Sequence, residues 1–302
     1  MVAALVVLYN PDAELMDRAL RSVASQVERV FAIDNTPESF DPPLTSFHEL
    51  GVTYIPLASN QGIAKAQNVG IREVLRAGYS HVLLLDQDSV LPANFVEKLL
   101  AAECDLLSRG IPVAAVGPLA VERKNGKRYG AVRHLWFHTN WISIDESMKA
   151  PVRTDYLNAS GSLIRTAIFE RIGFMMERLF IDGVDTEWCL RALSLGYQSY
   201  VVPEALMEHD LGNGIARLFG RDIVLHNNVR NYYIIRNIVY LLRARTMGGK
   251  WKTFALVYVP KYIVIHSWLS HQRWSSARLF LRALVDGILG RVGPLSSLEQ
   301  EL

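Results

Sequence analysis

The sequence is poor in cysteine: its 302 residues include only Cys104 and Cys189. Two cysteines cannot form the disulfide framework of a small secreted domain, and their spacing matches no zinc motif built from paired thiols. We therefore expect a reducing, cytoplasmic environment. The apolar run Ala3 to Leu8 has no basic segment before it and leads straight into Asn10-Pro11. It is predicted to be a first strand rather than a signal peptide.

Long hydrophobic runs and an excess of one charge are missing too. The longest late apolar stretch, Thr253 to Leu269, is interrupted by Lys261 and His266. It falls short of the roughly 20 apolar residues that a spanning helix needs, so no transmembrane helix is expected. The 32 Lys and Arg face 30 Asp and Glu, a net charge of +2. That balance excludes a uniformly basic chain, and we expect no nucleic-acid partner.

No short period recurs along the chain, which excludes collagen, coiled-coil and solenoid folds. No GxGxxG fingerprint and no GxxxxGK phosphate loop occurs, so the main sequence evidence for a dinucleotide dehydrogenase or a P-loop ATPase is missing. Half of the residues are hydrophobic, which is enough to build a core and excludes disorder. The length allows one large domain with an appendage, or two domains.

Short apolar strands alternate with amphipathic segments through the first 90 residues. Asn10 is predicted to cap a first helix, and Gly78 to end a second helix that spans about Gln61 to Ala77. Alternation of this kind predicts an α/β fold, with a doubly wound, mostly parallel sheet. The expected strands are Ala3–Leu8, Val30–Ile33, Val52–Ile55 and His81–Leu85.

Polar clusters follow these strands, where an open α/β sheet binds its ligands. The clusters are Tyr9-Asn10, Asp34-Asn35, Asn60 to Asn68, and Asp86-Gln87-Asp88. Asp86 and Asp88 could share one divalent cation and leave positions open for phosphates, or they could form a solvated turn. Asp34 stands where a ribose or base edge is usually read, although a helix cap would also explain it. Gly62 suits an anion-binding helix start or close backbone packing.

A second acidic site lies at Asp182 and Asp185, beside an apolar Phe-Ile pair. A helix that starts near Val184 would place Asp185 in its first turn and would pair Glu187 with Arg191. The ion pair gives Glu187 and Arg191 a structural role. It leaves Asp182 and Asp185 without one, and either carboxylate could serve as a general base. His209 follows the next apolar stretch, as a structural hydrogen-bonding group or as a cation ligand.

These residues in this order resemble glycosyltransferase family 2, the inverting GT-A enzymes that use nucleotide sugars. The resemblance covers about residues 3–212 and rests on seven segments: LVVLYNP, AIDN, NQGIAKAQNVGI, LLLDQDS, NASGSLI, FIDGVDTEWCLR and EHDLG. With the later RNYYxxRN, the chain looks most like bacterial rhamnosyltransferases that use dTDP-β-L-rhamnose. A GT-A domain over residues 1–211 is therefore expected, followed by a helical extension over residues 212–302.

The resemblance assigns roles residue by residue. It makes Asp185 the general base, although Val184 stands where the family more often has glutamate, which leaves Asp182 as a possible second carboxylate. It implies Mg²⁺ or Mn²⁺ on Asp88 and His209, with Asp86 at the ribose or the metal. The donor site would further include Tyr9, Asn10, Asp34 at the pyrimidine, Asn60, Gly62, Asn68, and Arg230, Tyr233 and Arg236 at the diphosphate. The acceptor would meet Asn158, Ser160, Gly161, Asp182 and Trp188.

The activity implied is transfer of L-rhamnose from dTDP-β-L-rhamnose to a hydroxyl of a saccharide or lipid-linked saccharide, giving an α-L-rhamnoside in cell-surface polysaccharide or lipopolysaccharide synthesis. UDP-galactofuranose or UDP-N-acetylglucosamine are alternative donors. A different class of protein, a nucleotide-sugar-binding scaffold without turnover, is argued against by the intact Asp88, Asp185 and His209. A nucleotidyltransferase is less favoured still, because the Gly-rich loop that usually follows the first strand of such enzymes is missing from this sequence.

The near-neutral total hides an uneven distribution of charge. From residue 212 to residue 291 there are thirteen Lys and Arg against two acids, so this segment carries +11 and the remainder −9. Trp and Tyr side chains lie among these basic residues. This composition suits peripheral contact with an anionic membrane, at the inner face of the cell membrane. It also suits helices that cover the sheet and leave their arginines in solvent.

Overall fold

The structure is a computed structural model of the chain, and it describes residues 1–37, 42–123, 126–145, 147–209, 214–218 and 221–295. The first half alternates strands and helices as the sequence predicts. Its elements are β1 (Val2–Leu8), α1 (Ala13–Ala24), β2 (Arg29–Asp34), α2 (Leu44–Glu49), β3 (Val52–Pro56), α3 (Ile63–Arg76), β4 (His81–Asp86), α4 (Phe95–Ser108) and β5 (Val113–Glu122).

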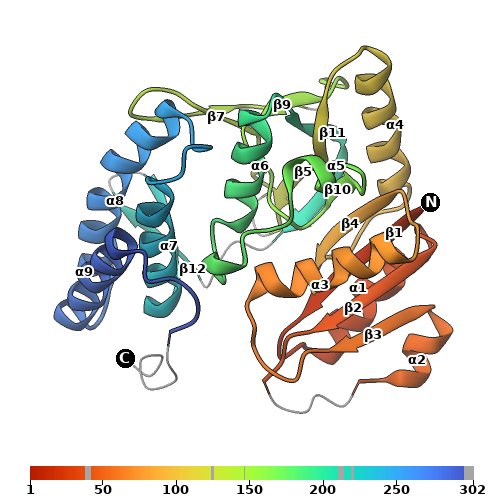
Figure 1. Cartoon of the computed structure of the whole chain (residues 1–302), viewed down its shortest axis with the longest axis horizontal. Coiled ribbons are helices and arrows are strands. Elements are labelled where there is room, and N and C mark those ends of the chain that lie inside the picture. Colours follow the sequence, from red (N-terminus) through yellow and green to blue (C-terminus); the bar gives the residue numbers. More distant parts are fainter. Residues whose placement is uncertain (38–41, 124–125, 146, 210–213, 219–220, 296–302) are drawn as a thin grey trace.

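The second half adds short strands and a group of C-terminal helices (Figure 1). The strands are β6 (Arg128–Tyr129), β7 (Ala131–His134), β8 (Thr139–Ile142), β9 (Val152–Thr154), β10 (Ser162–Arg165), β11 (Gln198–His209), β12 (Gly214–Leu218) and β13 (Arg221–Leu225). The helices are α5 (Ile168–Ile172), a 3₁₀ turn (Glu177–Leu179), α6 (Val184–Ser194), α7 (Asn228–Leu241), α8 (Gly249–Leu269) and α9 (Arg273–Leu289).

The main sheet has the strand order β3-β2-β1-β4-β10-β5-β11-β9. The first four strands are parallel, whereas β10 runs antiparallel between β4 and β5, so the sheet is mixed beyond β4. The register aligns the strand ends, because Leu8 of β1 pairs with Asp34 of β2 and Val7 pairs with Asp86 of β4. The polar residues after these three strands therefore meet at one edge of the sheet.

Each face of the sheet is covered by its own helices, as doubly wound packing requires. Alternate residues of β1 point to opposite sides, so that Leu5 packs with the core under α3 and α6, while Val6 packs with the core under α1 and α4. Strands that are buried on both faces read as continuous apolar runs, which explains the run from Ala3 to Leu8. The predicted α/β class is confirmed in this way.

The first helix starts later than the sequence predicts. Asp12, not Asn10, caps α1, because its carboxylate accepts the backbone N–H groups of Glu14 and Leu15. Asn10 instead adopts a positive φ of 43° in the turn that follows β1. Asparagine tolerates this conformation better than most residues, and the turn keeps Asn10 beside the other strand ends.

The C-terminal helices form a separate core around Tyr232, Val259 and Phe280, in which α7 packs against both α8 and α9. Figure 1 shows this group at the end of the molecule opposite β3. In the described part of the chain, no helix combines the length and the apolar character needed to span a bilayer. The expected domain boundary at residue 211 falls among residues 210–213, outside the described residues, and stays a prediction.

Candidate active site

Hydrogen bonds tie the loops after β1, β2 and β4 into one unit. The backbone N–H of Tyr9 donates to Oε1 of Gln87 at 2.7 Å, and Nε2 of Gln87 donates back to the Tyr9 carbonyl at 3.2 Å. The N–H of Asn10 donates to the hydroxyl of Thr36 at 3.1 Å. The strand ends are thus fixed against one another, with the phenol ring of Tyr9 exposed above them.

Asp34 is buried at the end of β2, and both its oxygens already accept hydrogen bonds. Oδ2 receives the hydroxyl of Tyr54 at 2.6 Å, and Oδ1 receives the backbone N–H of Thr36 at 3.0 Å. Two donors on one carboxylate hold it in a single orientation at the ligand edge. Its contact with a pyrimidine stays a prediction. Tyr54, which sequence reasoning missed, is recognisable only through this cross-strand contact.

The loop before α3 is bound to the same unit. Oδ1 of Asn60 accepts from Nδ2 of Asn35 and from the N–H of Gly62, both at 3.0 Å. Gly62 has a φ of +84°, and a Cβ there would lie 2.5 Å from the ring of Phe180. Only glycine fits this approach, as the close-packing interpretation of the sequence expected. Gly62 therefore brings the donor loops against the segment that carries Asp182.

Asn68 has a different place from the donor site predicted for it. It is buried, its amide donates to the Met175 carbonyl and accepts the Met175 N–H, both at 2.9 Å, and it also donates to Glu177. Because both polar atoms of this buried amide are already hydrogen-bonded inside the protein, the side chain is not placed to contact a nucleotide sugar. We therefore assign Asn68 to holding the 175–177 turn against α3.

The Asp86–Asp88 loop is joined to the segment before β10. The hydroxyl of Ser160 accepts the Asp86 N–H at 3.0 Å and bonds the Ser89 hydroxyl at 2.8 Å. Gly161 then turns the chain with a φ of +84°, and its N–H donates to Leu84 at 2.8 Å. Asp86 is half-buried, whereas Asp88 is exposed. The predicted acceptor segment therefore lies directly beside the paired aspartates.

Asp185 lies in the first turn of α6, as predicted, and faces the same segment from the other side. The Thr186 N–H donates to its Oδ1 at 2.7 Å, and the backbone of Ala159 also hydrogen-bonds its carboxylate. Burial raises the pKa of Asp185 above the usual aspartate range, although these bonds oppose the shift. The nearby Tyr156 hydroxyl has a raised pKa, first from burial and then from the charge of Asp185.

Asp182 is the second carboxylate of this loop, in a left-handed conformation with a φ of 62°. Burial raises its pKa to about 6, while Arg230, whose guanidinium lies 3.1 Å from Oδ1, favours the charged form. The charge of Asp185 adds to the increase. The two neighbouring carboxylates thus differ in their partners: Asp182 has an arginine, whereas Asp185 has backbone N–H groups and the Thr186 hydroxyl.

Helix α7 supports this acidic loop through side-chain hydrogen bonds. Nδ2 of Asn237 is positioned to donate to three carbonyls, those of Leu179 at 3.0 Å, Ile181 at 2.7 Å and Asp182 at 2.8 Å. The loop needs such support because Phe180, Asp182 and Gly183 all have positive φ values. Only the glycine adopts that conformation without cost. Asn237, the last residue of the RNYYxxRN motif, therefore holds the acidic loop in its conformation.

Two other members of that motif are buried rather than turned to a ligand. Nη2 of Arg236 donates to the Leu179 carbonyl at 2.9 Å, and the guanidinium lies 4.8 Å from the ring centre of Tyr233. Tyr233 stacks on Phe180 with ring centres 5.2 Å apart, and its hydroxyl accepts the Leu295 N–H. The diphosphate contacts predicted for Arg236 and Tyr233 would require these bonds to be exchanged.

Comparison with known proteins identifies the chain. A profile described as Glycosyl transferase family 2 matches residues 4–172. The dTDP-rhamnosyl transferase RfbF of Shigella flexneri is 33% identical over an alignment of 299 residues that covers 97% of each chain. The chain belongs to glycosyltransferase family 2.

Solved structures agree with the GT-A fold of this family. The chain resembles GalNAc-T7, solved with UDP, GalNAc and Mn²⁺, with a TM-score of 0.64 at 15% identity, covering 96% of this chain and 57% of that chain. It also resembles residues 1–349 of TarS from S. aureus, with a TM-score of 0.58 at 15% identity, covering 96% and 81%. The family 2 transferase therefore spans little more than half the length of the GalNAc-T7 structure.

The paired aspartates fit a hard divalent cation in part. Asp86 and Asp88 offer carboxylate oxygens of the kind that Mg²⁺ and Mn²⁺ prefer, and a nucleotide diphosphate would supply further oxygens. Within the described residues no three His, Cys, Asp or Glu side chains gather at one point. His209 ends β11, with its backbone opposite Glu122, but its side chain lies outside the described part of the chain.

Trp188 and Arg191 belong to the core of the family 2 transferase, not to its cleft. The indole of Trp188 is buried, and its N–H donates to the Gly173 carbonyl at 2.9 Å, so the acceptor contact predicted for it has no exposed surface. The predicted ion pair of Glu187 with Arg191 is confirmed, at 2.8 Å. It fixes the first turns of α6, and so the helix that carries Asp185.

Replacing Asn237 by alanine is expected to lower kcat at least tenfold while changing the donor KM by less than threefold. Alanine removes the two N–H donors that the three carbonyls share and the Oδ1 that accepts from the Arg236 guanidinium. At roughly 1 kcal/mol for each bond, the variant should also lose about 2–4 kcal/mol of unfolding free energy. Asn231→Ala is the matched control, because Asn231 is equally buried on α7 but bonds His226 and Tyr262. Equal loss of kcat in both variants would show that Asn237 contributes only to general stability and not to the position of the acidic loop.

Proposed function

We propose that the enzyme transfers L-rhamnose from dTDP-β-L-rhamnose to a hydroxyl of a saccharide or lipid-linked saccharide acceptor. One observation carries the proposal: the 33% identity to a dTDP-rhamnosyl transferase extends over 97% of both chains. Inversion at the anomeric carbon would give an α-L-rhamnoside. The product would belong to cell-surface polysaccharide or lipopolysaccharide.

In this proposal Asp185 is the general base. Its carboxylate lies beside Ala159, close to where Ser160 touches the Asp86 loop, so an acceptor hydroxyl between them would meet base and donor together. A raised pKa makes the Asp185 carboxylate a stronger proton acceptor than an exposed aspartate. The deprotonated hydroxyl would attack the anomeric carbon from the side opposite the diphosphate. A single displacement requires no covalent intermediate with the enzyme.

The departing dTDP needs positive charge around its diphosphate. A divalent cation held by Asp86 and Asp88, with His209 as a further ligand, would offset the negative charge that develops there. Arg230 is the chain's own candidate for the same task, since its side chain is 44% exposed and it starts helix α7 beside the acidic loop. Asn60 and the exposed Tyr9 would line the nucleotide from the strand ends.

The donor is tested by incubating the full chain with dTDP-β-L-rhamnose, UDP-galactofuranose and UDP-N-acetylglucosamine, each with Mn²⁺. Thermal stabilisation should be largest for the dTDP-sugar, and dTDP release should rise when an acceptor fraction is added. A UDP-sugar that stabilises and turns over better would replace rhamnose as the donor. Binding without nucleotide release in any fraction would instead favour a non-catalytic scaffold.

We further propose that helices α8 and α9 rest on the anionic inner face of the cell membrane. Large apolar side chains recur on their outer faces at helical spacing, among them Val264, which is 68% exposed, and Trp274, which is 86% exposed. The others are Leu256, Val257, Trp268, Leu281, Val285, Ile288 and Leu289. Exposed apolar side chains in this number are typical of interaction sites when they gather on one face.

The charge of this region selects an anionic partner. From residue 223 to residue 295 the sequence holds a single acid, Asp286, which is buried against Tyr232, Arg282 and Arg291. The exposed surface of α8 and α9 therefore carries positive charge and no exposed negative charge. A second copy of the same surface would be repelled, whereas phosphatidylglycerol headgroups would be attracted.

The double variant Lys261→Glu/Arg278→Glu is expected to lose retention by vesicles that contain 30% anionic lipid at low salt. Each basic residue near the surface is worth about 1 kcal/mol, so reversing two should weaken binding by more than about tenfold. Lys98→Glu/Arg109→Glu changes the charge equally at exposed positions on α4 and directly after it, and should bind as the wild type does. Equal loss in both variants, or wild-type retention by neutral vesicles, would contradict a specific docking face.

A further inference from the structure

The turn that joins β7 to β8 carries apolar side chains where a hairpin turn is normally polar. Leu135, Trp136 and Phe137 follow one another in it and are 37%, 55% and 63% exposed. The N–H of Leu135 closes the turn by donating to the His138 carbonyl at 2.9 Å. Glycine, asparagine and aspartate are the usual residues of such turns. Three consecutive exposed apolar side chains in a turn therefore indicate a surface that meets another apolar phase.

The backbone of this turn is strained at its central residues. Phe137 has a φ of 69°, in the left-handed region that bulky side chains rarely occupy. Glycine would adopt the same conformation without cost, but it would remove the exposed ring. Strain of this kind is typical of positions that are held for function. The chain thus keeps a phenylalanine at the tip of the hairpin although the local conformation favours glycine.

The hairpin tip lies against the start of helix α8, at the end of the molecule that the C-terminal helices occupy (Figure 1). The N–H of Phe137 donates to the hydroxyl of Thr253 at 3.4 Å. Leu256 and Val257 stand three and four positions after Thr253, on the same side of α8, and both are exposed. The tip and the exposed apolar side of α8 therefore form one continuous surface.

The residues beside this surface are basic. Residues 243–252, which connect α7 to α8 and begin α8, include two arginines and two lysines, and the sequence holds no acid from residue 223 to residue 285. Arg245 and Lys250 are exposed. Aromatic rings next to lysine and arginine are typical of the headgroup layer of an anionic membrane. A second copy of the same surface would bring like charges together, so lipid is the partner that fits.

We propose that Leu135, Trp136 and Phe137 insert into the headgroup layer of an anionic membrane, as a second contact beside helix α8. The inference rests on the membrane contact proposed above for α8 and α9, and it names the element that penetrates the layer. The basic residues attract the chain to the surface, whereas the three side chains of the tip gain by leaving water. Two separate contacts fix the orientation of the molecule on the membrane.

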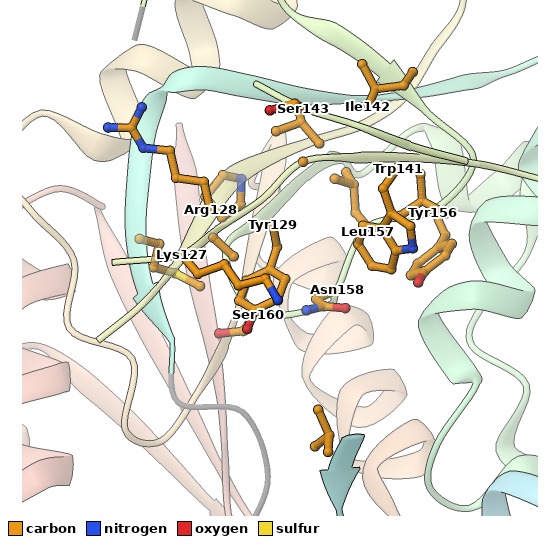
Figure 2. A pocket seen from close by; sticks show the side chains of 17 residues that line it. Lys127, Arg128, Tyr129, Trp141, Ile142, Ser143, Tyr156, Leu157, Asn158 and Ser160 are labelled. Carbon is orange, nitrogen blue, oxygen red and sulfur yellow. The ribbon is translucent and has the colours of Figure 1, made fainter. Parts of the chain in front are cut away.

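This orientation matters because the strands of the same hairpin line a cavity of about 640 Å³ beside the proposed active site. Figure 2 shows Trp141 of β8 next to Tyr156 in the cavity lining. Trp141 is three residues from His138, which is about 10 Å along an extended strand. Ser160 also lines the cavity, and its hydroxyl bonds the N–H of Asp86. Insertion of the tip would therefore hold the cavity, and the donor loop behind it, close to the headgroups.

The test places an environment-sensitive fluorophore at the tip. His138 is exposed, so His138→Cys in a Cys104→Ser background gives an accessible thiol at the turn, while Cys189 is buried. Nitrobenzoxadiazole attached there should shift to shorter wavelength and gain at least twofold in intensity when vesicles with 30% anionic lipid are added. The same label on Cys104 of the unmodified chain is the matched control, because this thiol is exposed on α4. Its emission should not change.

The double variant Trp136→Ser/Phe137→Ser should weaken partitioning into the same vesicles at least tenfold. Trp136→Tyr/Phe137→Tyr keeps aromatic rings at the tip and should bind within threefold of the wild type. Both variants should be stabilised by dTDP with Mn²⁺ as the wild type is, which shows that the fold is intact. Wild-type partitioning of the serine variant, or an unchanged label at residue 138 on vesicle-bound protein, would overturn the inference and leave the contact of α8 and α9 in place.

Other failures are recognised by other measurements. A shift of the label that needs no vesicles, with a dimer in light scattering that the serine variant lacks, would replace the membrane by a second copy of the chain. Absence of any vesicle retention of the wild type would overturn both membrane proposals. Release of dTDP from dTDP-β-L-rhamnose, with a detergent-solubilised acceptor fraction and no vesicles, reports on sugar transfer alone. Its absence would remove the rhamnosyl donor while leaving the vesicle measurements unaffected.

Discussion

Replacing Asp185 by asparagine is expected to reduce sugar transfer by about 10²–10⁴-fold, the usual contribution of a positioned general base. The amide keeps the size of the side chain and can still accept the Thr186 N–H, so the first turn of α6 should persist. It cannot take the proton of an acceptor hydroxyl. Donor affinity, measured as thermal stabilisation by dTDP with Mn²⁺, should stay within threefold of the wild type.

The pH dependence of the wild-type rate provides a second measure of the same role. The pKa of Asp185 is raised by burial, so its carboxylate becomes protonated at a higher pH than an exposed aspartate does. A base is active only when deprotonated. The transfer rate should therefore be lost as pH falls through a value above the usual aspartate range, and it should reach a plateau above it.

Asp182→Asn is the control for this experiment. Asp182 belongs to the same loop and has a pKa of about 6, but Arg230 occupies its carboxylate. We expect this variant to keep transfer within about tenfold, and to shift the acidic limb of the wild-type profile downward because a neighbouring negative charge is gone. If Asp182→Asn abolishes transfer and Asp185→Asn does not, the two roles are reversed.

The first half of the fold and the acidic loop could be predicted because their signals are local. A run such as Ala3–Leu8 identifies a buried strand from its own composition, and parallel strands place Asp34 and Asp86 at one edge without further information. The start of α6 near Val184 was likewise visible in the neighbouring residues. Fold class follows from such patterns because each depends on a few consecutive side chains.

The roles of buried polar side chains could not be predicted, since their partners are distant in sequence. Asn68 bonds residues 107 and 109 positions away, and Asn237 bonds three carbonyls more than 50 positions away. A motif identifies such residues as important without distinguishing a ligand contact from a structural one. For Arg236 and Trp188 the resemblance favoured the ligand, whereas the structure places both in hydrogen-bonded packing.

The antiparallel strand β10 shows the same limit at the level of topology. Its four residues, Ser162–Arg165, pair with β4 through a connection that no local pattern specifies. This insertion brings the Asn158–Gly161 turn against the Asp86 loop and opens the cavity between β5 and the β7–β8 hairpin. The nucleotide half follows from a repeated local pattern, while the acceptor half depends on contacts that only the folded chain reveals.

Removal of divalent metal, or of the Asp88 carboxylate, should have an effect comparable to loss of the base. EDTA is expected to abolish wild-type transfer, and Mn²⁺ or Mg²⁺ to restore it. Asp88→Asn should lower the rate by about 10²–10³-fold at 1 mM Mn²⁺, the usual cost of losing one electrostatic contact to the transition state. Because Asp88 is exposed, its replacement should change the unfolding free energy by no more than about 0.5 kcal/mol.

Asp105→Asn supplies the matched control for Asp88, since Asp105 is an exposed aspartate on α4 whose contact is the surface pair with Arg109. It should leave both the rate and the Mn²⁺ requirement unchanged. Full wild-type activity in EDTA would show that no metal is needed. A metal requirement that persists unchanged in Asp88→Asn would move the cation to other ligands, and His209→Ala would then be the variant that loses Mn²⁺ affinity. Because Asp86 and Asp88 are the pair that the described residues place at the strand ends, we expect the loss at Asp88.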